Sequence, residues 1–156
     1  MDLADLISRF SAVFHHGEIP ATFDVAVFEQ VGDLEVTTPL SYRALLCSSG
    51  GLFTPTILEE IVDRQLDFPD VQNIWLLSEV ARDTRDSWSG GMPQDMVGFA
   101  NDAGGNYFCY PRRRHRATLD DAPVWFFDHE SIEAHELSPS LAAWLAWYLD
   151  NLRPGT

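Results

Sequence analysis

The stretch from Val97 to Glu130 constrains the fold most, because strand-like segments alternate there with turn-forming ones. Apolar and small residues alternate over Val97–Ala100 with the period of a strand. Asp102–Asn106 is rich in residues that tolerate left-handed backbone angles, so it predicts a hairpin turn into a return strand at Tyr107–Tyr110. Val124–Phe127 is almost wholly apolar and predicts a third strand, covered on both faces. Together these segments predict an antiparallel sheet.

Helices are predicted before this stretch. Apolar residues recur at helical spacing from Leu3 to Phe14, and Asp2 is placed to cap that helix. A short helix is predicted over Thr22–Val31. Thr38 is expected to cap a further helix, with Pro39 at its first position. Its expected apolar face is Tyr42, Leu45 and Leu46, and its expected end is Ser49, Gly50 and Gly51.

The middle and the end of the chain predict a mixture of elements. Ile57–Leu66 favours a helix on the spacing of its apolar residues, which are chiefly Leu58, Ile61 and Val62. Asn73–Leu77 predicts a strand, and an acidic helical turn is expected to follow it as far as Trp88. Near the C-terminus, Ser138 is expected to cap an amphipathic helix that Pro139 opens and that runs to Leu152.

Length and composition limit the class of protein. A chain of 156 residues suits one domain spanning residues 1–156 and can bury a sizeable core. It contains no apolar run near the roughly 18 residues that a membrane span needs. The N-terminus lacks the basic start of a signal peptide, so a cytoplasmic location is expected. The two cysteines, Cys47 and Cys109, are expected to be buried thiols.

The charge of the chain excludes several kinds of chemistry. Asp and Glu number 24 against ten basic residues, for a formal net charge of −14. All ten basic residues are arginines, so phosphate loops of the Walker type, Schiff-base lysines and protein-kinase chemistry are excluded. The acidity argues against nucleic acid as a ligand, because binding it requires neutralising phosphates. A basic protein partner and simple solubility both remain open as explanations of the charge.

The titratable clusters do not form a catalytic motif, a cofactor motif or a strong metal motif. Adjacent strand residues point to opposite faces, so Asp128, His129 and Glu130 cannot converge as a unit. Their expected role is structural, at a strand end whose side chains satisfy neighbouring backbone groups. The spacing of His129, Glu133 and His135 matches no strong zinc pattern, so no metal site is expected.

Two further charged clusters are expected to be solvated. His15–Glu18 follows the first helix, where a cationic side chain suits the dipole of the helix C-terminus. Arg112–Arg116 is a basic run with two possible roles. It either binds phosphate or an acidic partner, or forms a solvated loop that balances the negative charge of nearby acidic residues. We favour the solvated loop, since a few arginines exert little long-range attraction in an acidic background.

Three segments resemble one family. They are TPLSYRALLCSSGG at Thr38–Gly51, DAGGNYFCY at Asp102–Tyr110 and PVWFFDHE at Pro123–Glu130, and a closing helix rich in Trp and Leu follows them. In this order they resemble the SUKH superfamily, named partly for a fungal regulator of cell-wall assembly, from about Thr22 to Leu152. The resemblance implies an α+β fold with a mostly antiparallel, curved sheet and helices packed beside it. It also implies a non-enzymatic role without a cofactor.

The resemblance further implies a protein partner. Bacterial members of the superfamily are generally viewed as immunity proteins that bind and neutralise a cognate polymorphic or contact-dependent toxin, often a nuclease. A basic toxin domain would suit the acidity of this chain, and neither nucleic acid nor a membrane is expected as a partner. The residues expected to contact the toxin lie in predicted loops and helix ends: Asp83, Asp86, Trp88, Asp120 and Asp121.

Two alternatives to a toxin-binding role are retained. One is a regulatory or scaffold module that binds another protein without a toxin. The other is a small enzyme that uses Asp128, His129 or Glu130. A deep polar pocket that joins one of these three residues to a second titratable group would favour the enzyme.

Overall fold

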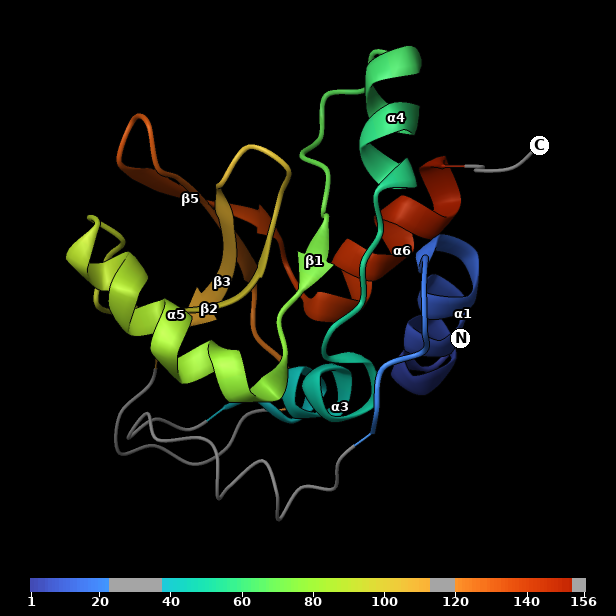
Figure 1. Ribbon diagram of the computed structural model, residues 1–156, viewed down its shortest axis with the longest axis horizontal. Coiled ribbons are helices and arrows are strands. Elements are labelled where there is room, and N and C mark those ends of the chain that lie inside the picture. The colour runs from blue at the N-terminus through green and yellow to red at the C-terminus, as the bar shows by residue number, and fades with distance from the viewer. Residues whose placement is uncertain (23–37, 113–119, 153–156) are drawn as a thin grey trace.

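The computed structural model describes residues 1–22, 38–112 and 120–152, and this part of the chain has the predicted α+β fold (Figure 1). The predicted helix over Thr22–Val31 and most of the Arg112–Arg116 run lie outside the described residues. The elements are α1 (Leu3–Phe14), α3 (Leu40–Ser49), α4 (Thr56–Asp63), β1 (Asn73–Ile74), α5 (Leu77–Ser89), β2 (Met96–Asn101), β3 (Tyr107–Pro111), β4 (Val124–Asp128), β5 (Glu133–Ser138) and α6 (Leu141–Asn151).

The sheet is an antiparallel meander in the order β1-β2-β3-β4-β5. The predicted hairpin turn is confirmed: Asp102 Oδ1 accepts hydrogen bonds from the backbone N–H groups of Gly104 (2.9 Å) and Asn106 (2.8 Å). The predicted third strand is also confirmed as β4, which lies between β3 and β5. The turn chemistry therefore sets the β2–β3 hairpin, from which the rest of the meander extends.

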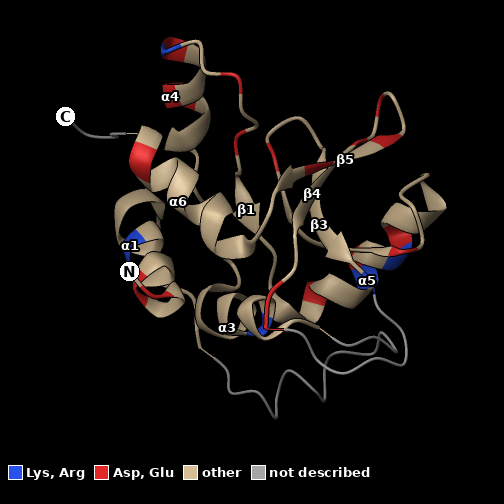
Figure 2. Cartoon of the chain, turned by 180° about the vertical axis from the view of Figure 1, so that it is seen from behind, with Lys and Arg blue, Asp and Glu red and all other residues tan. Residues whose placement is uncertain are grey.

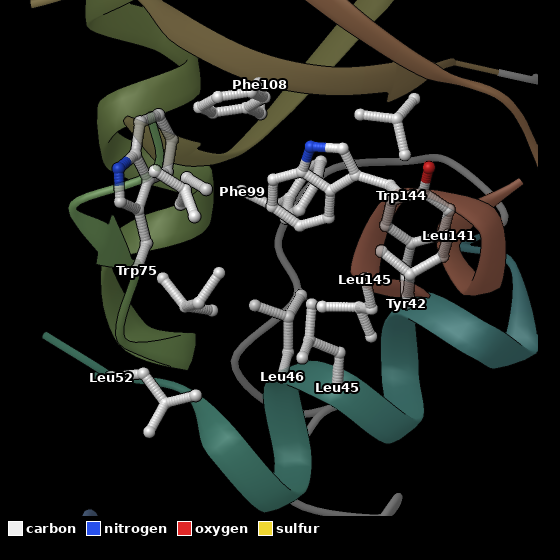
Figure 3. Close-up of a cluster of buried hydrophobic side chains, with 14 of the residues drawn as sticks. Tyr42, Leu45, Leu46, Leu52, Trp75, Phe99, Phe108, Leu141, Trp144 and Leu145 are labelled. Carbon is white, nitrogen blue, oxygen red and sulfur yellow. The ribbon is translucent and has the colours of Figure 1, made fainter. Parts of the chain in front are cut away.

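Helices pack against both faces of the sheet. Helices α1, α3 and α6 group on one side, whereas α5 lies against β2 on the other (Figure 1). On the α6 side, Trp144 is fully buried among aromatic rings, with centroids 5.4 Å from Phe99 and 5.0 Å from Phe108 (Figure 3). Alternate residues point the other way, because Cys109 and Phe127 join a smaller cluster with Met92 and Met96.

The predicted apolar faces of three helices can be compared with the structure. The face of α3 is confirmed, since Tyr42, Leu45 and Leu46 are fully buried. The faces of α1 and α6 are confirmed in the same way, by the buried residues Leu6, Ile7, Phe10, Phe14, Leu141, Trp144, Leu145, Tyr148 and Leu152. Asp2 caps α1, because its Oδ1 accepts a hydrogen bond from Asp5 N–H. These three helices contribute a substantial part of the larger core, together with residues of the sheet.

Two predicted helix caps are wrong. Thr38 does not cap α3, whose N-cap is Pro39; the Thr38 hydroxyl instead lies 3.3 Å from the Tyr110 hydroxyl across the core. Ser138 does not cap α6, because it is the last residue of β5. Ser140 is the cap, and its Oγ accepts a hydrogen bond from Ala143 N–H at 3.0 Å. In both places the serine or threonine that local propensity predicts as a helix cap interacts with the sheet instead.

The strand predictions are incomplete at both edges of the sheet. The predicted strand at Asn73–Leu77 shortens to two residues, since α5 already begins at Leu77. Strand β5, Glu133–Ser138, was not predicted, because its side chains are mostly polar and exposed and show no apolar alternation. Polar residues are typical of edge strands, which pair on one side only. Edge strands therefore leave a weak signal in sequence.

The helix predicted over Ile57–Leu66 is confirmed in part as α4, Thr56–Asp63, although only some of its apolar residues are buried. Ile57 and Ile61 are buried, whereas Leu58 and Val62 are exposed. The helix ends at Asp63 and is only eight residues long, so it buries one residue per turn and leaves its other apolar residues in solvent.

The end of α1 is bound to the sheet and is not simply solvated. A segment next to β1 continues the sheet, since Gly51 N–H donates to Ile74 O and Ile74 N–H donates to Leu52 O. Beyond it, Phe53 N–H donates to His15 Nδ1 at 3.0 Å. His15 Nε2 therefore carries the proton and donates to Glu18 O at 2.7 Å.

Candidate protein-binding site

Three acidic residues line one side of α5. Glu79, Asp83 and Asp86 are spaced four and three residues apart, so they share one face of the helix. Glu79 also anchors the start of the helix, because its Oε1 accepts a hydrogen bond from Leu76 N–H at 3.1 Å. Arg82 forms ion pairs with two of these acids, at 3.3 Å to Glu79 and 3.0 Å to Asp83. These hydrogen-bonded acids raise the pKa of the Arg82 guanidinium.

A groove runs between this acidic face and the sheet. It consists of two adjoining pockets that share Asp83, Trp75 and Asn101 as lining residues, and Asp86 and Tyr107 line one of the two. The Trp75 indole N–H donates to Asn101 Oδ1 at 2.9 Å, and its ring meets Tyr107 edge-on at 5.5 Å between centroids. The groove, which we call the α5 groove, therefore has an acidic wall and an aromatic floor.

The floor depends on a glycine in β2. A Cβ atom at Gly98 would lie 2.6 Å from Cη2 of Trp75, so no side chain fits between the strand and the indole. Gly98 N–H also donates to Thr84 Oγ1 at 3.0 Å, which ties β2 to the buried side of α5. The absence of a side chain at this position thus allows both the helix and the indole to approach the strand closely.

The β2–β3 turn closes one end of the α5 groove. Gly105 lines the groove, and the His129 ring lies against it, with Cε1 3.5 Å from the position of a Cβ there. The His129 backbone N–H donates to Asn106 Oδ1 at 3.1 Å, and ring atom Nδ1 lies 2.7 Å from the same oxygen. The turn after β4 therefore lies next to the groove.

The structure places the five predicted contact residues on two different segments, α5 and the stretch before β4. Asp83 and Asp86 lie together on the wall of the α5 groove. Trp88 lies further along α5 and is partly buried: its indole N–H donates to Met96 O at 2.8 Å, and the Arg112 guanidinium lies 4.6 Å from its ring centroid. Asp120 and Asp121 precede β4, on another part of the surface.

Asp121 has clear structural partners. Its Oδ1 accepts hydrogen bonds from Ser41 Oγ (2.7 Å), Ala122 N–H (2.8 Å) and Leu141 N–H (3.2 Å). Ser41 belongs to the first turn of α3, and Leu141 is the first residue of α6. This carboxylate therefore joins the starts of two helices, where negative charge is stabilising. Asp120 is exposed, and its backbone carbonyl accepts a hydrogen bond from Ser41 N–H.

The Asp128–Glu130 segment takes the structural role that its strand position predicts. Asp128 Oδ1 accepts hydrogen bonds from the N–H groups of Glu130 (2.9 Å) and Ser131 (3.2 Å), and so forms the turn after β4. Among residues 1–22, 38–112 and 120–152, no group of three or more His, Cys, Asp or Glu side chains could hold a metal ion. The segment thus stabilises the β4–β5 turn.

Both cysteines are buried, as predicted, and neither forms a disulfide. Burial, with a contribution from the negative charge of Asp95, raises the pKa of Cys109 far above its usual value. Such a thiol does not ionise at neutral pH and is a poor nucleophile.

None of the helices in the described part of the chain has the length and apolar character that a membrane span requires.

Sequence reasoning missed several residues of the α5 groove. Glu79 could have been found, since it continues the helical spacing of Asp83 and Asp86 one turn earlier. Trp75, Asn101 and Tyr107 could not, because they come together only through the pairing of β1, β2 and β3.

The fold and the groove define an acidic α+β domain with a surface suited to cationic groups. The chain belongs to the SMI1 / KNR4 family (SUKH-1), whose family model matches residues 24–147. This match confirms the SUKH resemblance over most of the chain. The family is generally one of binding domains and not of enzymes. Searches of curated proteins and of solved structures found no match.

Proposed function

We propose that this protein is a cytoplasmic immunity protein that binds and neutralises a cognate polymorphic or contact-dependent toxin. The part of the toxin that it binds is a basic nuclease domain. Membership of the SMI1 / KNR4 family supports a binding role. The net charge of −14 supports a basic partner, because a nuclease domain must be basic to hold its substrate. The single observation that carries the proposal is the α5 groove, in which acids border an aromatic floor.

The chemistry of the groove suits the arginine or lysine side chains of a partner. Asp83 and Asp86 would pair with a cation, and a ring edge or face of Trp75 or Tyr107 would contact its aliphatic or guanidinium part. The acidic residues elsewhere on the surface would raise the association rate with the partner. The groove would fix the orientation of the bound partner. Trp88, further along α5, and Asp120 and Asp121, on another part of the surface, remain proposed contacts.

Co-expression tests the proposed function directly. The protein is co-expressed with each of a panel of basic nuclease domains from polymorphic toxins, and growth is scored. Rescue from at least one domain, with binding of its catalytically inactive form by the purified protein, is the expected result. If the protein neither rescues growth nor binds any domain, the immunity role is wrong, and a regulatory or scaffold module without a toxin becomes the better explanation.

The role of the groove is tested by removing its charge without changing its shape. The double variant Asp83→Asn/Asp86→Asn should bind the rescuing domain roughly tenfold more weakly, because two charge-assisted contacts are lost. Asp63→Asn, at an exposed position on α4, is the control for a change in net charge and should bind within about twofold of the wild type. Equal losses in the groove variant and the control would mean that only overall charge matters.

A further inference from the structure

The turn between β4 and β5 holds one residue in a conformation that its side chain disfavours. Ile132 has a φ of 57°, in the left-handed region. A β-branched residue is a genuine outlier there, whereas glycine or asparagine adopts the same conformation at lower cost. Folding stability alone would therefore favour another residue at this position.

Gln65 offers a comparison, since it is the other non-glycine residue with positive φ in the described part of the chain. It follows the C-cap of α4, where Gln65 N–H donates to Val62 O and Leu66 N–H donates to Ile61 O. This pattern is a Schellman motif, which requires a left-handed residue at that point. The end of a helix thus explains Gln65, but no helix ends at Ile132.

The side chain of Ile132 is held in place and yet largely open to solvent. One side rests on Gly91, where a Cβ would lie 3.0 Å from Ile132 Cγ2. The residue nevertheless remains 55% exposed. An apolar side chain that is displayed at a backbone cost is typical of a contact residue, because strained positions concentrate at functional sites.

The turn around Ile132 is held by several hydrogen bonds and is acidic. The Asp128 carboxylate fixes the backbone of the turn, and His129 fixes it to Asn106 of the β2–β3 hairpin. Glu130 and Glu133 are exposed on either side of Ile132. Figure 2 shows acidic residues on this hairpin and along α5. The tip is therefore a preorganised apolar point within an acidic rim, an arrangement that lowers the entropy cost of binding.

We propose that Ile132 is the apolar anchor with which this face of the molecule docks on a basic protein partner. The partner would offer a shallow apolar depression bordered by arginine or lysine side chains. The hairpin tip and the α5 groove form one surface, because Gly91 lies just beyond α5 and His129 lies against Gly105 of the groove. The inference rests on the proposed function, since the partner is the basic toxin domain.

The test compares two asparagine substitutions at the left-handed positions, Ile132→Asn and Gln65→Asn. Binding to the same panel of inactive basic nuclease domains is measured by titration calorimetry, and thermal unfolding is followed in parallel. Ile132→Asn should weaken binding roughly 30-fold, as for an interface hot spot, without lowering the unfolding temperature. Gln65→Asn, on a different element, should leave both binding and the unfolding temperature close to the wild type.

A third variant, Ile132→Leu, retains the apolar surface and should bind within about threefold of the wild type. The inference is overturned if Ile132→Asn binds as the wild type does, or if its loss of binding accompanies a lower unfolding temperature, because Ile132 would then be a structural contact. In either case wild-type binding to a domain would leave the proposed function intact. If the wild type binds none of the domains, the proposed function and this inference both fail.

Discussion

Asp121 and Asp70 show how differently single carboxylates are used in this acidic chain. One carboxylate oxygen of Asp121 accepts hydrogen bonds from the first turns of both α3 and α6. Asp70 is buried, and its Oδ2 accepts a hydrogen bond from Ala103 N–H at 3.0 Å in the β2–β3 turn. Burial, and then the negative charge of Asp102, raise the pKa of Asp70. The charge of Asp121 thus supports the fold, whereas that of Asp70 costs stability.

The raised pKa of Asp70 predicts a pH-dependent effect of its removal. The folded state holds the Asp70 proton more tightly than the unfolded state, so its stabilising contribution is present at acid pH and is lost as pH rises through the folded pKa. Asp70→Asn removes the buried charge and retains an oxygen for Ala103 N–H. The variant should be more stable than the wild type at pH 7, and the difference should shrink towards about pH 3.

Denaturant unfolding at a series of pH values measures this difference. Asp67→Asn is the matched control, because Asp67 is exposed and only three residues away. It should change the free energy of unfolding by no more than about 0.5 kcal/mol at any pH. A lower stability of Asp70→Asn at pH 7 would mean that the ionised carboxylate contributes a net favourable interaction.

At the scale of elements, the packing of α5 against β2 forms the α5 groove. The helix approaches the strand closely because Thr84 bonds the backbone of Gly98, and the Trp75 indole covers the same glycine. The acidic face of α5 is thereby held over the aromatic floor. The sequence pattern of neither element predicts this arrangement, since a glycine inside a strand has several possible explanations.

Gly98→Ala tests this packing. The new methyl group would lie 2.6 Å and 2.8 Å from two carbon atoms of Trp75, so the indole or the strand must move. We expect a loss of about 1–3 kcal/mol in the free energy of unfolding, as for other overpacked sites. The loss should be smaller when the same substitution is made in a Trp75→Leu background, which a double-mutant cycle in denaturant unfolding would measure.

Gly104→Ala provides the control in the β2–β3 turn. A Cβ at Gly104 meets no atom closer than 3.6 Å, so this substitution should alter stability by no more than about 0.5 kcal/mol. If Gly98→Ala is equally mild, the indole moves aside without cost, and the floor of the groove is less rigid than its contacts indicate.

At the scale of the whole molecule, we expect charge to govern association with the proposed basic partner. The formal net charge is −14 and the chain has no lysine, so a basic partner is attracted from a distance. The association rate with a toxin domain should fall at least about tenfold between about 50 mM and 500 mM salt, because salt screens the attraction. The dissociation rate should change much less, since it depends on close contacts.

Surface-immobilised binding kinetics across this salt range provide the measurement. The Asp63→Asn control and the groove double variant should both show slower association, but only the groove variant should also dissociate faster. An association rate that is independent of salt would mean that the acidity of the chain serves solubility and not recognition.

Much of the fold could be predicted from the sequence because local interactions determine it. The helical spacing of Leu3–Phe14 and of α6, and the turn residues of Asp102–Asn106, correspond to α1, α6 and the β2–β3 hairpin. The weak points were the edge strand β5 and the two helix caps, where sheet pairing outweighs local propensity. Of the candidate site, Asp83 and Asp86 could be predicted as neighbours, because they share one helical face.

The class and family of this protein, its acidic character, and the helices and turns whose residues are close together in the chain can be derived from the sequence. The folded structure alone establishes which acids share a surface, because strand pairing brings Trp75 beside Tyr107 and places α5 above them. It also establishes that Asp121 joins two helices and that Ile132 is strained and exposed. Such features depend on contacts between distant residues, which a single sequence does not record.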